Sequence, residues 1–326
     1  MNNTSIVKAI NIALEHEMFA DEDVILFGED IGKNGGVFRA TDGLQEKFGS
    51  HRVLDTPLAE ALIGGLAVGI ASYGLKPVAE FQFMGFIYPA LEQIICHIAR
   101  MRYRTNGSIS CPVVIRVPYT GGINAPEHHS ESTEAILAHI PGLRIITPSS
   151  PQYAYSLLRL AIQSPDPVVF LEPKKIYNTV VSEIDYSKND ILIDKCNILQ
   201  NGNDLTIISW GAMLSKAQLA AKKAESELGI SICLIDLVSI KPIDQETLLN
   251  SVSNTGRCII VHEAAKTCGL AAEISSIITE NIWHTLLAPV IRVTGFDTTM
   301  PAAKLEQFYL PSVNLIYKKI HKIMEY

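Results

Sequence analysis

The chain has 326 residues, of which 48% are hydrophobic and 19% charged, and its formal net charge is −7. These values are typical of a globular protein with room for two domains. The negative charge argues against nucleic acid or an anionic membrane as a main partner.

The sequence also shows no recognisable targeting signal and no closely spaced cysteine pair. The longest apolar run, residues 61–73, is shorter than the ~20 residues that span a bilayer. The N-terminal residues show neither a signal-peptide nor a transit-peptide pattern, and the six cysteines form no CxxC pair. We therefore expect a cytoplasmic protein with reduced thiols and neither a zinc site nor a disulfide framework.

Short β-branched runs alternate with helical patterns in the first half of the chain. The N-terminal segment predicts an amphipathic helix with Ile6, Ile10 and Leu14 on its apolar side. Predicted strands are 23–30, 76–83, 112–118, 143–148 and 167–173, and further predicted helices are 57–73, 88–104 and 151–163. This rhythm predicts a parallel sheet with helices on both faces.

A polar, irregular stretch at 177–203 separates this half from a second alternation. Predicted strands there are 205–211, 231–240, 257–263 and 290–295, and predicted helices are 213–228, 270–282 and 312–325. We predict an α/β fold of two doubly wound domains, residues 1–185 and 200–326.

The helix predicted at 57–73 is apolar except for one acid near its start, Glu60. Asp55 or Thr56 is a suitable N-cap. The helix contains three glycines: Gly64, Gly65 and Gly69. Each costs about 1 kcal/mol against alanine, so their presence indicates close approach of a backbone or a ligand. Glu60 either complements the helix macrodipole or serves as a functional carboxylate.

The loop 119–132 contains two adjacent histidines, His128 and His129. No HExxH or other ligand spacing accompanies them, which argues against a metal site. An acid/base role is favoured because glycine-flanked loops after strands carry active sites in α/β folds. The alternative is a solvated capping loop.

Two further candidates, Gln82 and Phe86, lie where the predicted strand 76–83 ends, a favoured place for ligand contacts. The sequence has no GxxxxGK[ST] loop and no GxGxxG after a strand. It also lacks a Gly-Asp-Gly segment with the downstream asparagine that holds Mg²⁺ on a diphosphate. A self-contained nucleotide or diphosphate site is therefore not expected.

Several long motifs, in order, resemble the β subunit of the E1 component of 2-oxo acid dehydrogenase complexes. They include DTPLAEALIGGLAVG (55–69), EFQFMGFIYPALEQI (80–94), APEHHSE (125–131) and RVTGFDTTMP (292–301). The resemblance implies a thiamine pyrimidine-binding domain followed by a transketolase C-terminal-like domain. It also implies a thiamine diphosphate site shared between subunits, in which the α subunit holds the diphosphate and Mg²⁺.

The resemblance assigns roles to particular residues of this chain. It implies that the Glu60 carboxylate hydrogen-bonds the pyrimidine N1′ and favours the imino tautomer, and that Gln82 and Phe86 line the pyrimidine pocket. Branched-chain members often have tyrosine at the position of Phe86. The resemblance gives His129 the positioning and protonation of groups during reductive acylation of the lipoyl arm.

The resemblance further implies an assembly and a reaction. We expect an α₂β₂ heterotetramer with an E1 α subunit, an E2 lipoyl acyltransferase as the next partner, and K⁺ held by backbone carbonyls of Val113, Ala161, Ser164 and Asp166. The expected reaction is oxidative decarboxylation of a branched-chain 2-oxo acid or pyruvate, with acyl transfer to E2. Open alternatives are an acetoin dehydrogenase or transketolase-like β subunit, and a non-catalytic assembly subunit.

Overall fold

The chain forms two units, each built around its own sheet. The computed structural model describes residues 3–188 and 190–326. The first unit consists of the residues up to Tyr119 together with Ile136–Ile193, and the second of Thr120–Ala135 and Asp194–Tyr326. The segment Thr120–Ala135, which lies inside the predicted first domain, therefore groups with the second unit.

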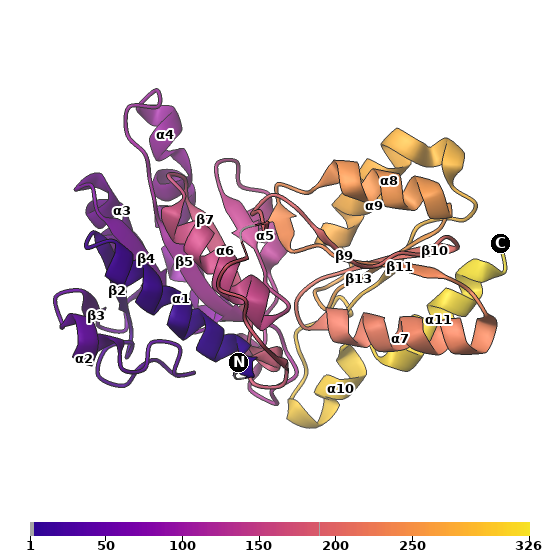
Figure 1. The fold of residues 1–326 in the computed structure, drawn as a ribbon, viewed down its shortest axis with the longest axis horizontal. Helices are drawn as coiled ribbons and strands as arrows, with labels where there is room; N and C mark the ends of the chain where they lie inside the picture. The colour runs from indigo at the N-terminus through magenta and orange to yellow at the C-terminus, as the bar shows by residue number, and fades with distance from the viewer. Residues whose placement is uncertain (1–2, 189) are drawn as a thin grey trace. The chain divides into compact units, whose positions relative to one another are not determined.

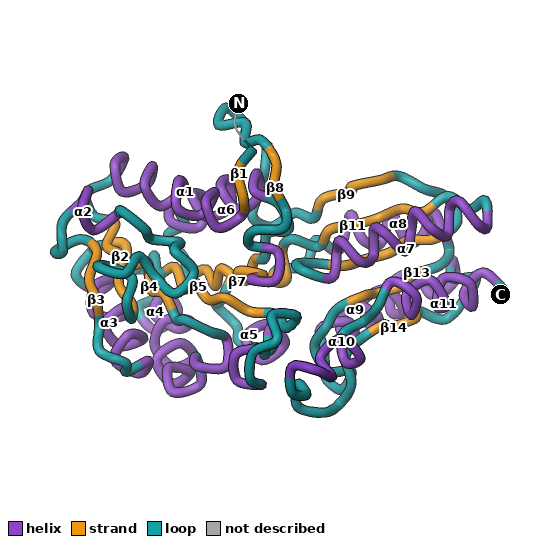
Figure 2. The backbone as a smooth tube through the Cα atoms, turned by 90° about the horizontal axis from the view of Figure 1, so that it is seen from below, coloured by secondary structure: helices purple, strands orange, loops and turns teal. Residues whose placement is uncertain are grey.

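Parallel strands form the sheet of the first unit, in the order β6–β7–β5–β4–β2–β3. The strands are β2 (Val24–Gly28), β3 (Val53–Asp55), β4 (Lys76–Glu80), β5 (Val114–Tyr119), β6 (Arg144–Ile146) and β7 (Val168–Pro173). The helices are α1 (Ile6–Ala20), α2 (Leu44–Phe48), α3 (Glu60–Ser72), α4 (Met101–Arg104) and α6 (Pro151–Gln163). Figure 2 shows α1 and α6 on one face of the sheet and α3 and α4 on the other. A short antiparallel ladder also joins β1 (Thr4–Ser5) to β8 (Val181–Ser182).

Local sequence accounts for the two helices on the first of these faces. Ser5 caps α1 by accepting from the Lys8 N–H at 3.4 Å, and the predicted apolar side is fully buried. Ser150 caps α6 in the same way, and Pro151 occupies its first turn. The predicted bounds of α6 are confirmed, because its cap, its proline and its apolar period all agree.

The segment 88–104, predicted as one helix, is helical over this whole range but is not a regular α-helix. The chain forms 3₁₀ turns at Tyr88–Ala90 and Ile98–Arg100, a π-helical stretch at Gln93–His97, and only then α4. An apolar repeat near 3.6 residues does not distinguish these helix types. Their backbone hydrogen bonds differ in span by only about one residue from 3₁₀ to α and from α to π.

The second unit has a mixed sheet in the order β14–β13–β10–β11–β9, in which only β9 runs antiparallel to its neighbour. The strands are β9 (Asn197–Gln200), β10 (Leu205–Ser209), β11 (Ile232–Asp236), β13 (Cys258–Val261) and β14 (Ile291–Val293). The helices are α7 (Met213–Leu228), α8 (Gln245–Thr255), α9 (Leu270–Ile282), α10 (Glu306–Tyr309) and α11 (Val313–Met324). In Figure 1, α8 and α9 cover one face of this sheet and α7 and α11 the other.

The strand predicted over 231–240 is wrong, because it is two strands. β11 ends at Asp236, and β12 (Ser239–Lys241) follows after a break. Val238 has a φ of 52°, a left-handed conformation that is costly for a β-branched residue. No glycine or asparagine marks this turn, so its sequence continues to look like a strand.

A cluster of charges is buried at the carboxyl end of the first sheet. Arg116 donates to Glu80 Oε2 at 2.6 Å and to both Glu172 oxygens at 2.7 and 3.0 Å. Tyr177 hydrogen-bonds the same Glu172 carboxylate. Burial raises the pKa of Glu80, although the charge of Arg116 opposes the rise. Removing one partner of a buried pair costs about 3–5 kcal/mol, so the cluster ties β4, β5 and β7 together at this edge.

Two chain-wide features complete the fold. In the described ranges no helix is long and apolar enough to cross a membrane. All six cysteines are free thiols.

Candidate active site

The predicted site residues of the first unit follow strands that are neighbours in the sheet. β2 lies between β3 and β4, with Gly28 paired to Asp55 on one side and to Glu80 on the other. Glu60 follows β3, and Gln82 follows β4. Because the carboxyl ends of parallel strands share one edge, both residues lie at the edge where open α/β sheets bind ligands.

Glu60 is the first residue of α3 and is half-buried. The predicted cap is wrong: the N-cap is Ala59, and no side chain caps the helix. Asp55 still belongs to β3 and accepts instead from the N–H groups of Gly32 and Lys33, at 2.6 and 3.1 Å. The start of α3 therefore has free backbone N–H groups with a carboxylate beside them.

A second acid, Glu29, follows β2 directly and interacts with Glu60. Burial raises the pKa of Glu29, and the negative charges of Asp30 and Glu60 raise it further. Two carboxylates that repel one another favour a bound proton on one of them. This edge of the sheet is thus suited to holding a proton near Glu60.

Aromatic rings set the position of Phe86. Phe86 meets Phe83 edge to face at 5.4 Å between ring centroids, Phe83 meets Phe38 at 5.5 Å, and Phe38 meets Tyr177 at 5.3 Å. Phe83 and Tyr177 are buried, whereas Phe86 and Gln82 are half-buried. Such T-shaped contacts are favourable, so a buried aromatic base supports two partly accessible side chains.

The α3 glycines differ in what surrounds them. A Cβ on Gly64 would lie 2.9 Å from Gln93 Cβ and 3.4 Å from Ala90 Cβ, which is the expected close approach of a backbone. A Cβ on Gly65 would meet only Gln93 Oε1 at 3.9 Å, and one on Gly69 would meet nothing within 4 Å. The face of α3 that carries Gly65 and Gly69 is therefore open within this chain.

His129 lies in the second unit, in the segment Thr120–Ala135. This segment begins with left-handed φ angles of 82° at Thr120, 87° at Gly122 and 58° at Asn124. A 3₁₀ turn, Glu127–His129, then places His129 half-buried, with its N–H donating to the Pro126 carbonyl at 2.9 Å. The loop thus has a defined shape despite its irregular backbone.

Two buried carboxylates of the second unit hold this loop. Glu263 Oε1 accepts from the Gly121 N–H and from the Ser132 hydroxyl, both at 2.6 Å. The Glu306 carboxylate accepts from the Gly122 N–H and, at 2.8 Å, from the Asn124 N–H. Glu263 is 5% exposed and Glu306 2%. Both acids therefore accept hydrogen bonds from the segment that contains His129.

A small cavity adjoins the loop within the same unit. Its volume is about 200 Å³, and its lining combines polar residues, among them Ser130, Ser132 and Glu263, with apolar ones such as Ala264 and Met300. Glu134, 1% exposed, follows this lining. Burial raises the pKa of Glu134 to about 8; hydrogen bonds from its own backbone and from Trp210 oppose the rise, and the charge of Glu263 adds to it. At neutral pH Glu134 is therefore largely protonated.

His262 is a further buried titratable group of this region. Its ring stacks on Trp210 with centroids 5.2 Å apart and an interplanar angle of 11°. Burial lowers the pKa of His262 to about 4, and the charge of Arg292 lowers it further. The ring is therefore neutral at physiological pH and serves the packing of the second unit.

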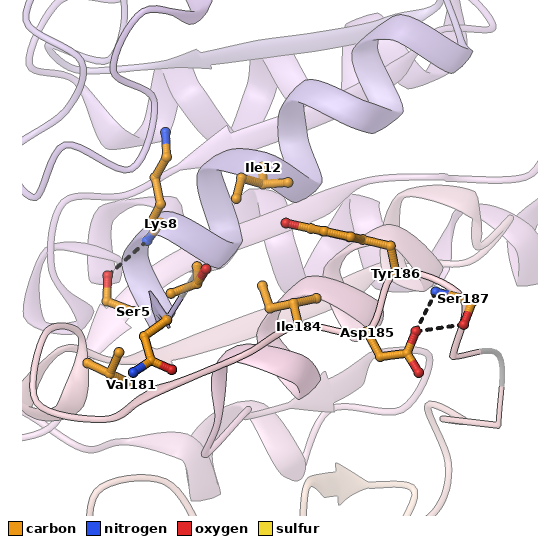
Figure 3. Close-up of a pocket in the computed structure, with 10 residues that line it drawn as sticks. Ser5, Lys8, Ile12, Val181, Ile184, Asp185, Tyr186 and Ser187 are labelled. Atoms are coloured by element: carbon orange, nitrogen blue, oxygen red, sulfur yellow. Dashed lines mark hydrogen bonds between the residues drawn. The ribbon is translucent and has the colours of Figure 1, made fainter. Parts of the chain in front are cut away.

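A larger cavity in the first unit contains none of the predicted site residues. It measures about 850 Å³ and lies between the start of α1 and the segment 181–187 (Figure 3). Its polar groups bond to one another: Ser5 Oγ accepts from Lys8, and Asp185 Oδ1 accepts from the N–H and hydroxyl of Ser187. Its walls are mostly apolar, among them Ile12, Val181, Ile184 and Tyr186.

Comparison with known proteins identifies the family. Residues 2–179 match the family described as "Transketolase, pyrimidine binding domain", and residues 194–316 match "Transketolase, C-terminal domain". Pyruvate dehydrogenase E1 component subunit beta of Acholeplasma laidlawii is 47% identical over 98% of this chain and 97% of its own length. The same-named protein of Staphylococcus epidermidis is 44% identical over the full length of both chains. The chain belongs to the E1 β-subunit family of 2-oxo acid dehydrogenases.

Other relatives of this E1 β chain broaden the comparison. The 3-methyl-2-oxobutanoate dehydrogenase subunit beta of Mycobacterium tuberculosis is 43% identical over 98% of this chain and 92% of its own length. A solved structure titled "Split gene transketolase, inactive beta4 tetramer" matches 99% of each chain with a TM-score of 0.81 and 23% identity, which shows a common fold. The predicted family, enzyme class and fold class, two transketolase-type α/β domains, are confirmed.

Sequence reasoning assigned no functional role to three acids of this E1 β chain. Glu29 lies near the end of the predicted strand 23–30, and Glu263 ends the predicted strand 257–263, where the pair His262–Glu263 was interpreted as structural. Glu306 had no local signal, since its partner Gly122 lies 184 positions away in the chain.

Proposed function

We propose that this chain is the β half of an E1 enzyme that decarboxylates a 2-oxo acid and passes the acyl group to a lipoyl group of E2. One observation carries the proposal. Glu60 is the first residue of α3, a helix without a side-chain cap. It lies beside a second acid, Glu29, and at the same sheet edge as Gln82. An acid in the first turn that only complemented the helix dipole would need neither Glu29 nor Gln82 nearby.

The side chains at this edge fit the pyrimidine half of thiamine diphosphate. The Glu60 carboxylate would hold a proton shared with a ring nitrogen, and the Gln82 amide can both donate and accept. Phe86 offers a partly accessible ring to an aromatic ligand. When bound, the cofactor supplies the electron sink for decarboxylation. Glu60 orients it and controls the proton.

In this proposal an E1 α subunit holds the diphosphate and Mg²⁺, in an α₂β₂ assembly. The missing Gly-Asp-Gly motif supports this division. So does the open side of α3, where Leu62 is 49% exposed and Gly69 has no atom near its absent Cβ. Leu58, just before the helix, is 72% exposed. A helix that is apolar all round calls for cover on every side, which the α subunit would give.

His129 acts in this proposal on the lipoyl arm, as the group that positions and protonates it during reductive acylation. Its place on a shaped, partly accessible loop supports the role. The free thiols support a cytoplasmic location.

A monovalent cation, K⁺, is proposed on the backbone of Val113, Ala161, Ser164 and Asp166. The Val113 carbonyl accepts from the Val168 N–H at 2.9 Å, the Ala161 carbonyl from the Ser164 N–H at 3.2 Å, and the Asp166 carbonyl from the Ser164 hydroxyl at 2.9 Å. Each of these oxygens keeps a second lone pair for a cation. A higher melting temperature in KCl than in choline chloride at equal ionic strength would support this site, and equal values would count against it.

Turnover by the chain co-purified with an E1 α subunit tests the function. The assay supplies thiamine diphosphate, Mg²⁺ and an artificial electron acceptor, and compares pyruvate, 3-methyl-2-oxobutanoate and acetoin. Activity with α and none without it supports a shared site, and the preferred substrate decides between the two dehydrogenase classes and the acetoin alternative. Silence with all three substrates, in an assembled complex, favours the transketolase-like or assembly alternatives.

Glu60→Gln tests the proposed role of the carboxylate. We expect turnover to fall by about 10²–10³-fold, the usual loss when a key electrostatic contact of the transition state is removed. Glu46→Gln is the matched control, because Glu46 is an exposed first-turn acid of α2 in the same unit. Equal activities of the two variants would show that Glu60 serves only its helix.

A further inference from the structure

Glu306 is a buried carboxylate that accepts hydrogen bonds from the loop that contains His129. We propose that Glu306, assisted by Glu263, is a positioning residue that holds His129 in place for acyl transfer to the lipoyl group. The inference rests on the proposed role of His129 and adds the residues that enforce it.

The two oxygens of Glu306 serve different donors of the loop. Oε1 accepts from the Gly122 N–H, and Oε2 accepts from the Asn124 N–H at 2.8 Å. The Asn124 side-chain amide, turned to suit its neighbours, donates to Oε2 at 3.1 Å and to the Ala303 carbonyl at 3.2 Å. A buried carboxylate is costly unless it is hydrogen-bonded, so these main-chain donors and the acid depend on one another.

The loop also approaches α10 closely. A Cβ on Gly121 would lie 2.6 Å from Met300 Cε and 3.1 Å from Glu306 Oε1. Gly121 itself donates to Glu263. The first part of the loop is therefore in close contact with Met300 and Glu306.

The loop is also held on the C-terminal side of His129. The Ser132 hydroxyl donates to Glu263 Oε1 at 2.6 Å, the same oxygen that accepts from Gly121. The segment between Asn124 and Ser132, with the 3₁₀ turn of His129 inside it, is thus held at both ends. Fixing a loop in advance removes the entropic cost of ordering it during the reaction, which is how a remote residue contributes to rate.

Glu306→Gln is the variant that tests this assignment. Glutamine has one carbonyl oxygen, so one of the two loop N–H groups would face an amide NH₂ in place of an acceptor. In the complex with E1 α, we expect reductive acylation of a free lipoyl domain to slow by at least about tenfold, the effect of losing a charge-assisted hydrogen bond. Turnover with an artificial acceptor should change far less. Glu325→Gln, which alters an exposed carboxylate of the same unit, is the control.

A double variant separates positioning from general damage. In the His129→Ala background, Glu306→Gln should cause no further loss of lipoyl acylation, because both changes act on one group. The proposal is overturned if the losses of the two single variants multiply in the double variant. It is also overturned if Glu306→Gln lowers lipoyl acylation and artificial-acceptor turnover equally. Glu306→Asp, which keeps the charge but shortens its reach, is measured beside it in case the glutamine variant does not assemble. It should also slow acylation and speed hydrogen exchange in residues 120–132, and wild-type values of both overturn the assignment.

The proposed function is checked first in the same preparation. No turnover by the wild-type complex refutes the function, whereas normal turnover with no effect of His129→Ala refutes only the role proposed for His129. Either result also removes the role of Glu306. Normal turnover, a loss in His129→Ala and wild-type acylation in Glu306→Gln refute the role of Glu306 alone.

Discussion

Replacing Glu134 by glutamine should stabilise the second unit above pH 5, by an amount that grows with pH. Glu134 is buried, and its pKa of about 8 in the folded chain stands against 4.5 for an ordinary glutamate. An unfolded chain releases this proton near pH 4.5, whereas the folded chain keeps it until about pH 8. Between these values the folded state binds more protons, so its stability falls as pH rises.

The size of the effect follows from the pKa difference. Each unit is worth about 1.4 kcal/mol, so the wild-type chain loses about 3 kcal/mol of unfolding free energy by pH 7 and about 4 kcal/mol by pH 8. Glutamine has a similar shape and does not titrate. The two proteins should therefore be similarly stable at pH 5 and diverge above it.

Urea unfolding of the purified chain, followed by tryptophan fluorescence at pH 5, 6, 7 and 8, measures this difference. Trp210 lies beside Glu134 and reports on the correct unit. Glu325→Gln is the control, since Glu325 is mostly exposed. A constant difference between wild type and Glu134→Gln across this pH range would refute the reasoning, because it would mean that Glu134 ionises normally in the folded chain.

Two further changes probe other parts of the molecule. Gly69→Ala should raise the unfolding free energy of the isolated chain by about 0.5–1 kcal/mol, because its Cβ would meet open space, whereas Gly64→Ala should lower it through contact with Gln93. Denaturant titration of both variants checks this, and the same sign for both would contradict it. His262 should make the chain about 3 kcal/mol less stable at pH 4 than at pH 6.5. In the unfolded chain the ring binds a proton below about pH 6.5, whereas in the folded chain it does so only near pH 4. His262→Phe, which keeps a ring against Trp210, should lose this dependence, and an unchanged pH profile in that variant would contradict the assignment.

Local sequence predicted the fold where local signals agree with one another. The bounds of α6, α7 and α9 match the predicted ranges, because the apolar period and the flanking residues point to the same ends. The predictions failed where one pattern permits several backbones. The apolar residues of 88–104 suit 3₁₀, α and π turns alike. No glycine or asparagine near Val238 indicates a left-handed turn there.

The candidate site divides in the same way. Glu60, Gln82 and His129 were predicted because motifs and strand ends are visible along the chain. The order of β3, β2 and β4, which puts Glu60 and Gln82 at one edge, appears only in the folded sheet. The loop contacts of Glu263 and Glu306 were beyond the reach of sequence patterns, since a carboxylate that accepts from distant main-chain N–H groups has no local signature.

The division of the chain into units has a consequence for synthesis. The segment Thr120–Ala135 leaves the ribosome long before its anchors, because Gly122 precedes Glu306 by 184 positions. At about 5–20 residues per second, the histidine loop waits on the order of ten to forty seconds for the carboxylate that shapes it. A nascent chain that stalls before α10 could complete the first sheet and still lack a formed loop. Completion of the loop that contains His129 is thereby tied to nearly complete translation of the chain.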